Sequence, residues 1–202
     1  MSDDINKDKE IKTILLGDAG VGKTNIINRV TGKKFNDDEK STKAASFSVK
    51  IITINNKKYE IDLWDTIGQE LYRQLNKLFF NNSKIVIFVY DITKKETFKS
   101  LEGWVNDVEE KLGPDVVKGV IANKSDLYLD EQVEENEGRE FSDSINAKFL
   151  TFSAKNDTTK KIEDYLTNLV EEFLLLNRQK SNERFTLTRE SVLENKKNSC
   201  CK

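Results

Sequence analysis

Short apolar blocks alternate along the chain with stretches in which apolar residues recur every three or four positions. The blocks predict six strands, over residues 11–16, 47–54, 59–64, 84–90, 116–122 and 148–152. Polar residues 55–58 separate the second block from the third, which predicts an antiparallel hairpin. Helical spacing predicts two helices that pack on a core, with the stripes Phe98, Leu101, Val105, Val108, Leu112 and Ile162, Leu166, Leu169, Val170, Phe173.

The order of these elements predicts an α/β fold. Strands that alternate with helices form βαβ units, so we expect a six-stranded, mostly parallel sheet with helices on both faces. Thr93 and Glu96 are spaced as a capping box at the start of the helix that contains Phe98. Residues 9–176 would form the domain, after a flexible N-terminus over residues 1–8. From residue 177 the periodicity fails, and seven basic residues against three acidic ones predict a disordered tail over residues 177–202.

Composition narrows the function classes. Charged residues make up 34% of the chain but nearly cancel to a net charge of −2, which argues against a nucleic-acid binder. The chain has no histidine, so histidine triads and histidine metal sites are excluded. Its only cysteines, Cys200 and Cys201, are adjacent, which excludes a disulfide framework and favours a reducing compartment. Because no apolar leader or bilayer-spanning run is present, we expect a soluble intracellular protein.

A glycine-rich segment follows the first predicted strand and precedes a helix. It matches the pattern G-x-x-x-x-G-K-[ST], whose backbone N–H groups can form a nest around phosphate oxygens. Lys23 would reach the outer phosphates, and the Thr24 hydroxyl would bind Mg²⁺. The segment comprises Gly17, Asp18, Ala19, Gly20, Val21, Gly22, Lys23 and Thr24. It predicts binding of a nucleoside phosphate without identifying the base.

Two further polar segments follow predicted strands, where an open parallel sheet places its ligand crevice. The first is Asn123, Lys124, Ser125 and Asp126. The Asp126 carboxylate could accept from the ring N–H and the exocyclic amine of guanine, a pair of donors that adenine lacks. The second segment is Ser153, Ala154 and Lys155, where a backbone N–H could donate to the guanine carbonyl. Together the two segments predict guanine recognition.

With these motifs, residues 8–176 resemble the Ras superfamily of small GTPases, and its Rab branch in particular. The resemblance rests on GDAGVGKT from residue 17, WDTIGQE from residue 64, NKSD from residue 123 and SAK from residue 153. VYDIT from residue 89 and Trp104 are also similar to Rab proteins. Only 27 positions separate Asp126 from Ser153, too few for the extra helix of the Rho branch. Ran is similar in its WDT sequence but lacks terminal cysteines.

The resemblance implies how a nucleotide and Mg²⁺ would be held. Lys23 and the loop amides would bind the phosphates, and Phe35 would lie against the guanine. Thr24 and Thr42 would ligate Mg²⁺, with Asp65 acting through a water.

The resemblance also implies the parts of a hydrolytic switch. The Gly68 amide would sense the γ-phosphate, and Gln69 would position the attacking water, while an external activator would supply further charge stabilisation. Loss of the γ-phosphate would release the contacts of Thr42 and Gly68, so that two switch loops relax and partners dissociate.

Three departures from the family pattern change the expectations. Ile67 stands where the family usually has alanine, and its β-branched side chain could slow hydrolysis or displace the second switch; alternatively it packs outward. Residues 43–46 replace the usual residues before Phe47, so no known effector can be carried over. Glu39 stands where many relatives carry an aromatic, and we expect its carboxylate to point into solvent, away from the γ-phosphate.

The C-terminal cysteines suggest a membrane anchor. Cys200 and Cys201 do not form a CaaX box, but a double cysteine is similar to the doubly geranylgeranylated tails of Rab proteins. Two prenyl chains give stable anchoring, and a tail with a net charge of +4 would favour an anionic leaflet. Unmodified thiols are the alternative, because Lys202 follows the pair.

These observations predict a Rab-like small GTPase that binds GTP and GDP with Mg²⁺, hydrolyses GTP, and acts as a switch in vesicle trafficking. The resemblance implies an exchange factor, a GTPase-activating protein, a GDP-dissociation inhibitor and effectors as partners, no nucleic acid, and a place on the cytosolic face of intracellular membranes. One alternative is a GTP-loaded binding scaffold with little intrinsic hydrolysis, which the presence of Gln69 argues against. Another is an ATP-dependent kinase or ATPase, which would share only the phosphate-binding loop.

Overall fold

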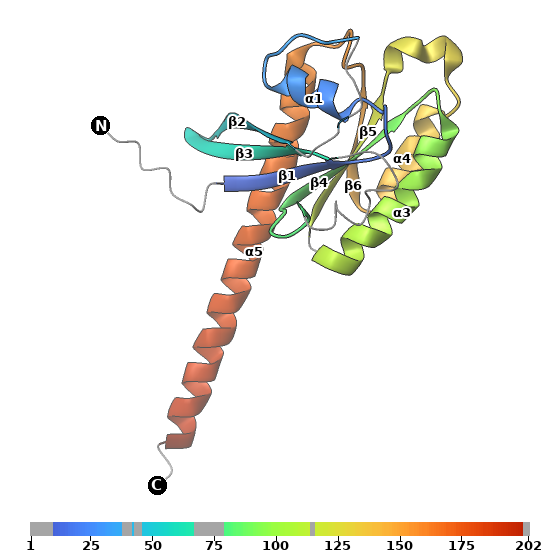
Figure 1. Ribbon diagram of the computed structural model, residues 1–202. Helices are drawn as coiled ribbons and strands as arrows, with labels where there is room; N and C mark the ends of the chain where they lie inside the picture. Colours follow the sequence, from blue (N-terminus) through green and yellow to red (C-terminus); the bar gives the residue numbers. More distant parts are fainter. Residues whose placement is uncertain (1–9, 38–41, 43–45, 67–78, 114–115, 200–202) are drawn as a thin grey trace.

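The computed structural model describes residues 10–37, 42, 46–66, 79–113 and 116–199, with the backbone alone for residues 180–199 (Figure 1). Its elements are β1 (Glu10–Leu16), α1 (Lys23–Val30), β2 (Ser46–Ile54), β3 (Lys57–Asp65), β4 (Ile85–Asp91), α3 (Lys95–Leu112), β5 (Val117–Asn123), the 3₁₀ segment η3 (Ser125–Asp130), α4 (Glu135–Ser144), β6 (Ala147–Phe152) and α5 (Thr159–Ser199). All six predicted strands are present within about two residues of their predicted bounds.

The strands form one sheet in the order β2-β3-β1-β4-β5-β6. Only the β2–β3 pair is antiparallel, and every other neighbouring pair is parallel, which confirms the predicted topology. The hairpin between β2 and β3 turns at Asn55 and Asn56, both at positive φ, as in a type I′ turn. Because β1, β4, β5 and β6 are parallel, their carboxyl ends lie at the same edge of the sheet.

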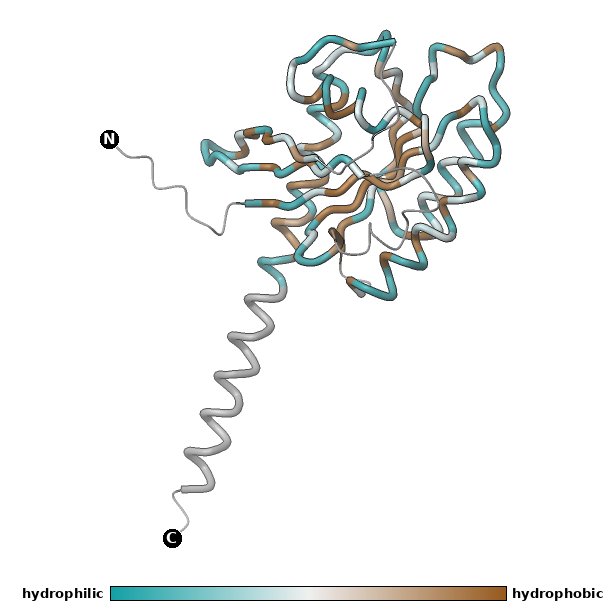
Figure 2. Tube along the Cα trace, viewed as in Figure 1, coloured by the Kyte–Doolittle hydropathy of each residue, from teal (hydrophilic) through white to brown (hydrophobic). Residues whose placement is uncertain are grey.

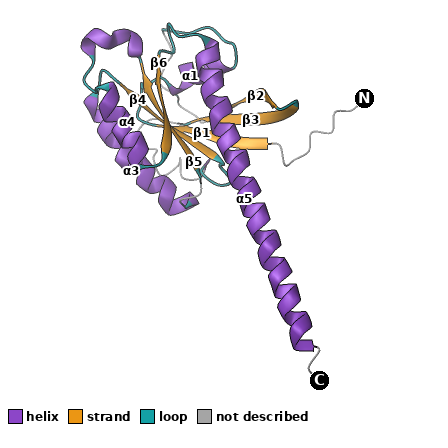
Figure 3. Cartoon of the chain, turned by 180° about the vertical axis from the view of Figure 1, so that it is seen from behind, coloured by secondary structure: helices purple, strands orange, loops and turns teal. Residues whose placement is uncertain are grey.

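Helices cover both faces of the sheet. One core, which includes Ile11, Ile26 and Leu169, lies between the sheet and helices α1 and α5; the other, which includes Phe88, Trp104 and Val120, lies under α3. Figure 3 shows α5 crossing one face while α3 and α4 lie on the other. Figure 2 shows the apolar residues concentrated in the central strands, as a sheet buried on both faces requires.

The helix α5 differs from the sequence-based expectation. Its packed part ends near Leu176, close to the predicted boundary of the domain, but the helix itself continues to Ser199 and leads away from the domain (Figure 1). The lost periodicity predicts disorder from residue 177. Residues 159–199 contain neither glycine nor proline, so nothing in the backbone interrupts the helix after its contacts with the domain end.

The predicted capping box at the start of α3 is also wrong. Lys94 is the N-cap residue and makes no side-chain capping bond. The Thr93 hydroxyl instead donates to Asp91 Oδ1 at 2.7 Å, and the Thr97 hydroxyl donates to the Lys94 carbonyl at 2.8 Å. The Thr93 N–H and hydroxyl both donate to Asp91 Oδ1, which holds Thr93 outside the helix, and the N-cap residue Lys94 has no side-chain oxygen that could accept from an N–H of the first turn. Among the described residues, no helix is both long enough and apolar enough to cross a membrane.

Candidate functional site

The glycine-rich loop connects β1 to α1 at the carboxyl edge of the sheet. Gly17 and Gly22 both have positive φ, of 144° and 97°. A Cβ at Gly17 would lie 2.2 Å from the Val89 carbonyl oxygen, and one at Gly22 would lie 2.3 Å from Asn123 Nδ2. The loop therefore requires glycine at both ends, because β4 and β5 press directly against its backbone.

Lys23 begins α1 and directs its side chain back across this loop. Its Nζ donates to the carbonyls of Gly17 and Asp18 at 2.7 and 2.9 Å, and the residue is only 5% exposed. Burial lowers the pKa of Lys23 to about 8, although Asp65 and Asp18 partly offset this effect. A buried ammonium at the start of a helix, beside a glycine-rich loop, is suited to an anion.

The three predicted metal ligands converge from three separate segments. Thr24 lies at the start of α1, Thr42 in the connection between α1 and β2, and Asp65 at the end of β3. The Thr24 hydroxyl donates to Asp65 Oδ2 at 2.7 Å and lies 2.9 Å from the Thr42 hydroxyl. The Thr42 hydroxyl donates to the same Oδ2 at 3.3 Å. The structure therefore brings three oxygen ligands to one point, next to Lys23.

At the far side of the same edge, Asn123 joins two loops. It is 1% exposed, and its Nδ2 donates to the Val21 carbonyl at 2.7 Å. Its Oδ1 accepts from the Ala154 N–H at 3.2 Å. One amide side chain at the end of β5 therefore fixes the glycine-rich loop on one side and the segment after β6 on the other.

Asp126 and Ser153 also meet at this edge. The Ser153 hydroxyl donates to Asp126 Oδ1 at 2.5 Å and accepts from the Asn156 N–H at 2.9 Å. The Ser153 N–H donates to Asp157 Oδ2 at 2.8 Å. These bonds hold the Asp126 carboxylate beside the segment 153–155, the two segments from which the sequence predicts a guanine site.

Lys124 and Lys155 complete this side. Lys124 has a positive φ of 67°, and its Nζ lies 2.6 Å from Asp91 Oδ2. Lys155 Nζ lies 5.8 Å from the centre of the Phe35 ring and 3.2 Å from Asp37 Oδ1. Phe35 and the base-side loops are thus brought together across a large distance in sequence.

Some predicted site residues lie outside the described part of the chain. They are Glu39, residues 43–45, Ile67, Gly68, Gln69, Cys200 and Cys201. From the sequence, no role in the site was assigned to three residues that hold it: Asp91, which pairs with Lys124; Asp157, which accepts from the Ser153 N–H; and Trp104, whose indole donates to Asp18. For Asp91, the available sequence signal was its position at the carboxyl end of the strongly apolar strand β4.

The match to known proteins agrees with this geometry. The model of the Ras family matches residues 12–175. Ras-related protein Rab-22A of Homo sapiens is 39% identical over 148 residues, which cover 73% of this chain and 76% of that protein. The chain belongs to the Rab family of Ras-related small GTPases. Ras-related protein Rab-21 of Geodia cydonium is 34% identical over 82% of this chain and 72% of its own length. GTP-binding protein ypt3 of Schizosaccharomyces pombe is 34% identical over 82% of this chain and 77% of its own length.

Family membership confirms the main functional predictions. This Rab protein is a small GTPase that binds GTP and GDP and acts in vesicle trafficking. Family membership does not favour the alternative of a GTP-loaded scaffold with little hydrolysis.

Proposed function

We propose that this Rab GTPase holds GTP or GDP together with Mg²⁺ at the carboxyl edge of its sheet and uses the γ-phosphate to set the state of two switch segments. The observation that carries this proposal is the convergence of Thr24, Thr42 and Asp65, whose oxygens lie within 3.3 Å of one another. Two of these residues belong to fixed elements, whereas Thr42 belongs to a connection. A ligand that binds the Thr42 hydroxyl would therefore couple that connection to α1 and β3.

The three residues fit Mg²⁺ rather than a metal that needs a protein cage. Within the described residues, no group of three or more histidine, cysteine, aspartate or glutamate side chains is arranged so that it could hold a metal ion. Mg²⁺ prefers oxygen ligands and is usually held by one or two carboxylates with substrate phosphates and waters. The Thr24 and Thr42 hydroxyls would bind it directly, and Asp65 through a water. When bound, Mg²⁺ neutralises charge on the β- and γ-phosphates.

Hydrolysis in this proposal depends on positioning and charge. The Lys23 ammonium and the amides of Asp18, Ala19, Gly20, Val21, Gly22, Lys23 and Thr24 would hold the phosphates. The Gly68 amide would bind the γ-phosphate, and Gln69 would orient the attacking water. Asp126 would read guanine, with the Ala154 segment donating to its carbonyl and Phe35 lying against the ring. The roles of Gly68 and Gln69 rest on the family resemblance.

The same scheme extends to partners and to the membrane. After hydrolysis, release of Thr42 and Gly68 would lower the affinity for effectors; an exchange factor, an activating protein and a dissociation inhibitor would regulate the cycle. Cys200 and Cys201 would carry prenyl groups that place the protein on the cytosolic face of intracellular membranes. Mass spectrometry of the native C-terminus tests this last point, and an unmodified C-terminal peptide from a membrane fraction would contradict it.

The first test of the nucleotide site is chromatography of the nucleotide released from the heat-denatured protein. We expect stoichiometric GDP, because guanine is recognised and GTP is turned over. Recovery of GTP would support the guanine site but contradict turnover. Absence of guanine nucleotide, even after loading with Mg²⁺ and excess GTP, would overturn the site.

The metal is tested separately by the rate of GDP dissociation. Removing Mg²⁺ with EDTA should raise this rate by about tenfold or more, because the protein then holds the phosphates without the cation that neutralises their charge. In Asp65→Ala the same treatment should have a smaller effect. An equal effect of EDTA on the variant and the wild type would contradict the assignment of Asp65, while leaving guanine binding intact.

A further inference from the structure

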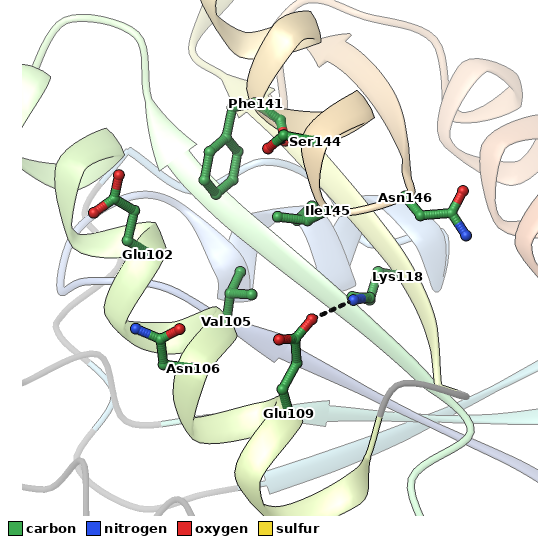
Figure 4. Close-up of a pocket in the computed structure, with 9 residues that line it drawn as sticks. All are labelled: Glu102, Val105, Asn106, Glu109, Lys118, Phe141, Ser144, Ile145 and Asn146. Atoms are coloured by element: carbon green, nitrogen blue, oxygen red, sulfur yellow. Dashed lines mark hydrogen bonds and ion pairs between the residues drawn. The ribbon is translucent and has the colours of Figure 1, made fainter.

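A cavity of about 570 Å³ lies between α3 and α4, on the face of the sheet opposite α5 (Figure 4). It is lined by Glu102, Val105, Asn106, Glu109, Lys118, Phe141, Ser144, Ile145 and Asn146. Lys118 is the second residue of β5, whereas Asn123 of the nucleotide site is the last. The two positions are therefore roughly 16 Å apart along the strand. The cavity is distinct from the nucleotide site and has a size that suits a side chain or a small ligand.

The cavity has an apolar part and an exposed polar rim, and the largely buried Lys118 of β5 also lines it. Val105 lies on α3, and Phe141 and Ile145 lie across from it at the end of α4 (Figure 4). On α3 the residues Glu102, Asn106 and Glu109 follow helical spacing, so they line one face of the helix toward the cavity. Such an arrangement suits a ligand with an apolar stem and a polar end.

The charges that line the cavity select a cation. Lys118 Nζ lies 2.7 Å from Glu109 Oε1, and with only 7% of its side chain exposed it is already neutralised. Glu102 is exposed and forms no ion pair with any of the residues that the structure describes. The cavity also lies at the carboxyl end of α4, the negative end of the helix dipole, and α4 has no basic residue in its last turn. Glu102 and the carboxyl end of α4 thus give the cavity a negative potential, and Lys118, the only basic residue among the described residues that line it, is already paired with Glu109.

We propose that this cavity is a docking site for an arginine side chain of a partner protein. The aliphatic part of an arginine would pack on Val105 and Ile145, and its planar guanidinium would stack near Phe141. Its five donors would meet the carboxylates and amides of the rim, which a lysine ammonium, with three donors on a compact head, matches less well. Because α5 lies on the other face of the sheet (Figure 3), the basic tail of the same chain leads away from the cavity.

The probe is the peptide acetyl-Leu-Arg-Leu-amide, titrated into the ¹⁵N-labelled, GDP-loaded full chain and followed by NMR. We expect amide shifts confined to residues 102–109, 117–119 and 141–146. The same peptide with citrulline, which keeps the shape but removes the charge, should bind at least threefold more weakly. Shifts elsewhere on the molecule, or equal binding of the citrulline peptide, overturn the proposal.

Substitutions at the rim test the sign of the potential. Glu102→Gln should weaken binding roughly two- to fivefold, since an exposed ion pair contributes little more than this, and it leaves the Lys118–Glu109 pair intact. Lys118→Met should strengthen binding, because Glu109 then becomes available to the guanidinium. The matched control is Glu140→Gln, an exposed carboxylate of α4 that does not line the cavity. Unchanged binding in Glu102→Gln, or weaker binding in a folded Lys118→Met, contradicts a cation site.

A second copy of this chain is the alternative occupant, since its tail is basic. Sedimentation of the protein alone distinguishes the two. We expect a monomer in both the wild type and Glu102→Gln. A dimer that Glu102→Gln dissociates would assign the cavity to a second copy and overturn the assignment to a partner protein.

Discussion

The indole Nε1 of Trp104 donates a hydrogen bond to Asp18 Oδ1 at 3.2 Å. Trp104 is 1% exposed in the core under α3, and Asp18 is the second residue of the phosphate-binding loop. This bond connects a rigid helix to a loop that is otherwise held by its own backbone and by Lys23 and Asn123. Asp18 also raises the pKa of Lys23, against the stronger effect of burial. Trp104 therefore positions the loop rather than the nucleotide.

Trp104→Phe should raise the rate of GDP dissociation about fivefold, because loss of one such bond costs about 1 kcal/mol. Phenylalanine preserves the aromatic packing in the core. The matched control is Trp64→Phe, since Trp64 Nε1 has no hydrogen-bond partner within the described residues. If both variants release GDP at the same rate, the bond does not position the loop. Fluorescent GDP measures both rates directly.

Nucleotide affinity should decrease as the pH rises above about 8. Burial lowers the pKa of Lys23 to about 8 in the free protein, and a bound phosphate would raise it again. Above pH 8 the free protein has therefore lost a proton that the complex still holds, so binding takes up a proton and weakens, by up to about tenfold per pH unit. Titration of GDP between pH 7 and 9.5 measures this slope.

The control for this slope is Lys23→Arg, whose guanidinium stays protonated throughout the range. The ionisation of guanine itself affects both proteins equally, so the difference between their slopes reports Lys23. Equal slopes would contradict the assignment. The lowered pKa also affects stability, because the buried charge of Lys23 reduces the free energy of unfolding of the nucleotide-free protein. This reduction is complete below pH 8, and it declines as the pH rises from about 8 toward the ordinary lysine value of 10.5.

Asn123→Ala should weaken GDP binding by about 1–3 kcal/mol, because the Val21 carbonyl and the Ala154 N–H both lose a buried partner. The change should also lower the free energy of unfolding. Asn136→Ala, which removes an exposed amide of α4, serves as the control. A variant with normal GDP affinity would show that the link between the two loops is dispensable. Isothermal titration and thermal unfolding measure the two effects.

Ile67→Ala should speed single-turnover GTP hydrolysis, severalfold for each ~1 kcal/mol of crowding that is relieved. Residue 67 lies outside the described part of the chain, so this prediction rests on the sequence alone. Gln69→Leu provides the reference for lost hydrolysis. An unchanged rate in Ile67→Ala would favour the alternative in which the isoleucine packs outward.

Local rules predicted the sheet and the position of the glycine-rich loop well, but they failed at two places. The pattern of residues 93–96 indicated a capping box, yet the Thr93 hydroxyl binds Asp91, a carboxylate whose position depends on β4. The expected disorder after residue 176 followed from lost periodicity, whereas the helix continues because its backbone contains no breaker. In the first case a carboxylate two residues away overrode the capping pattern, and in the second the absence of helix-breaking residues outweighed the lost apolar periodicity.

The sequence by itself determined the alternation of strands and helices, the phosphate-binding motif, the two base-side motifs and the identity of the residues that should form a site. These depend on backbone preferences and on apolar periodicity, which act over a few residues. Only the tertiary structure decided that Asn123 bridges Val21 and Ala154, that Thr24, Thr42 and Asp65 share one point, and that α3 and α4 enclose a cavity. Such contacts join residues far apart in the chain, and they exist only because parallel strands bring their carboxyl ends to one edge and the packed helices leave room on one face.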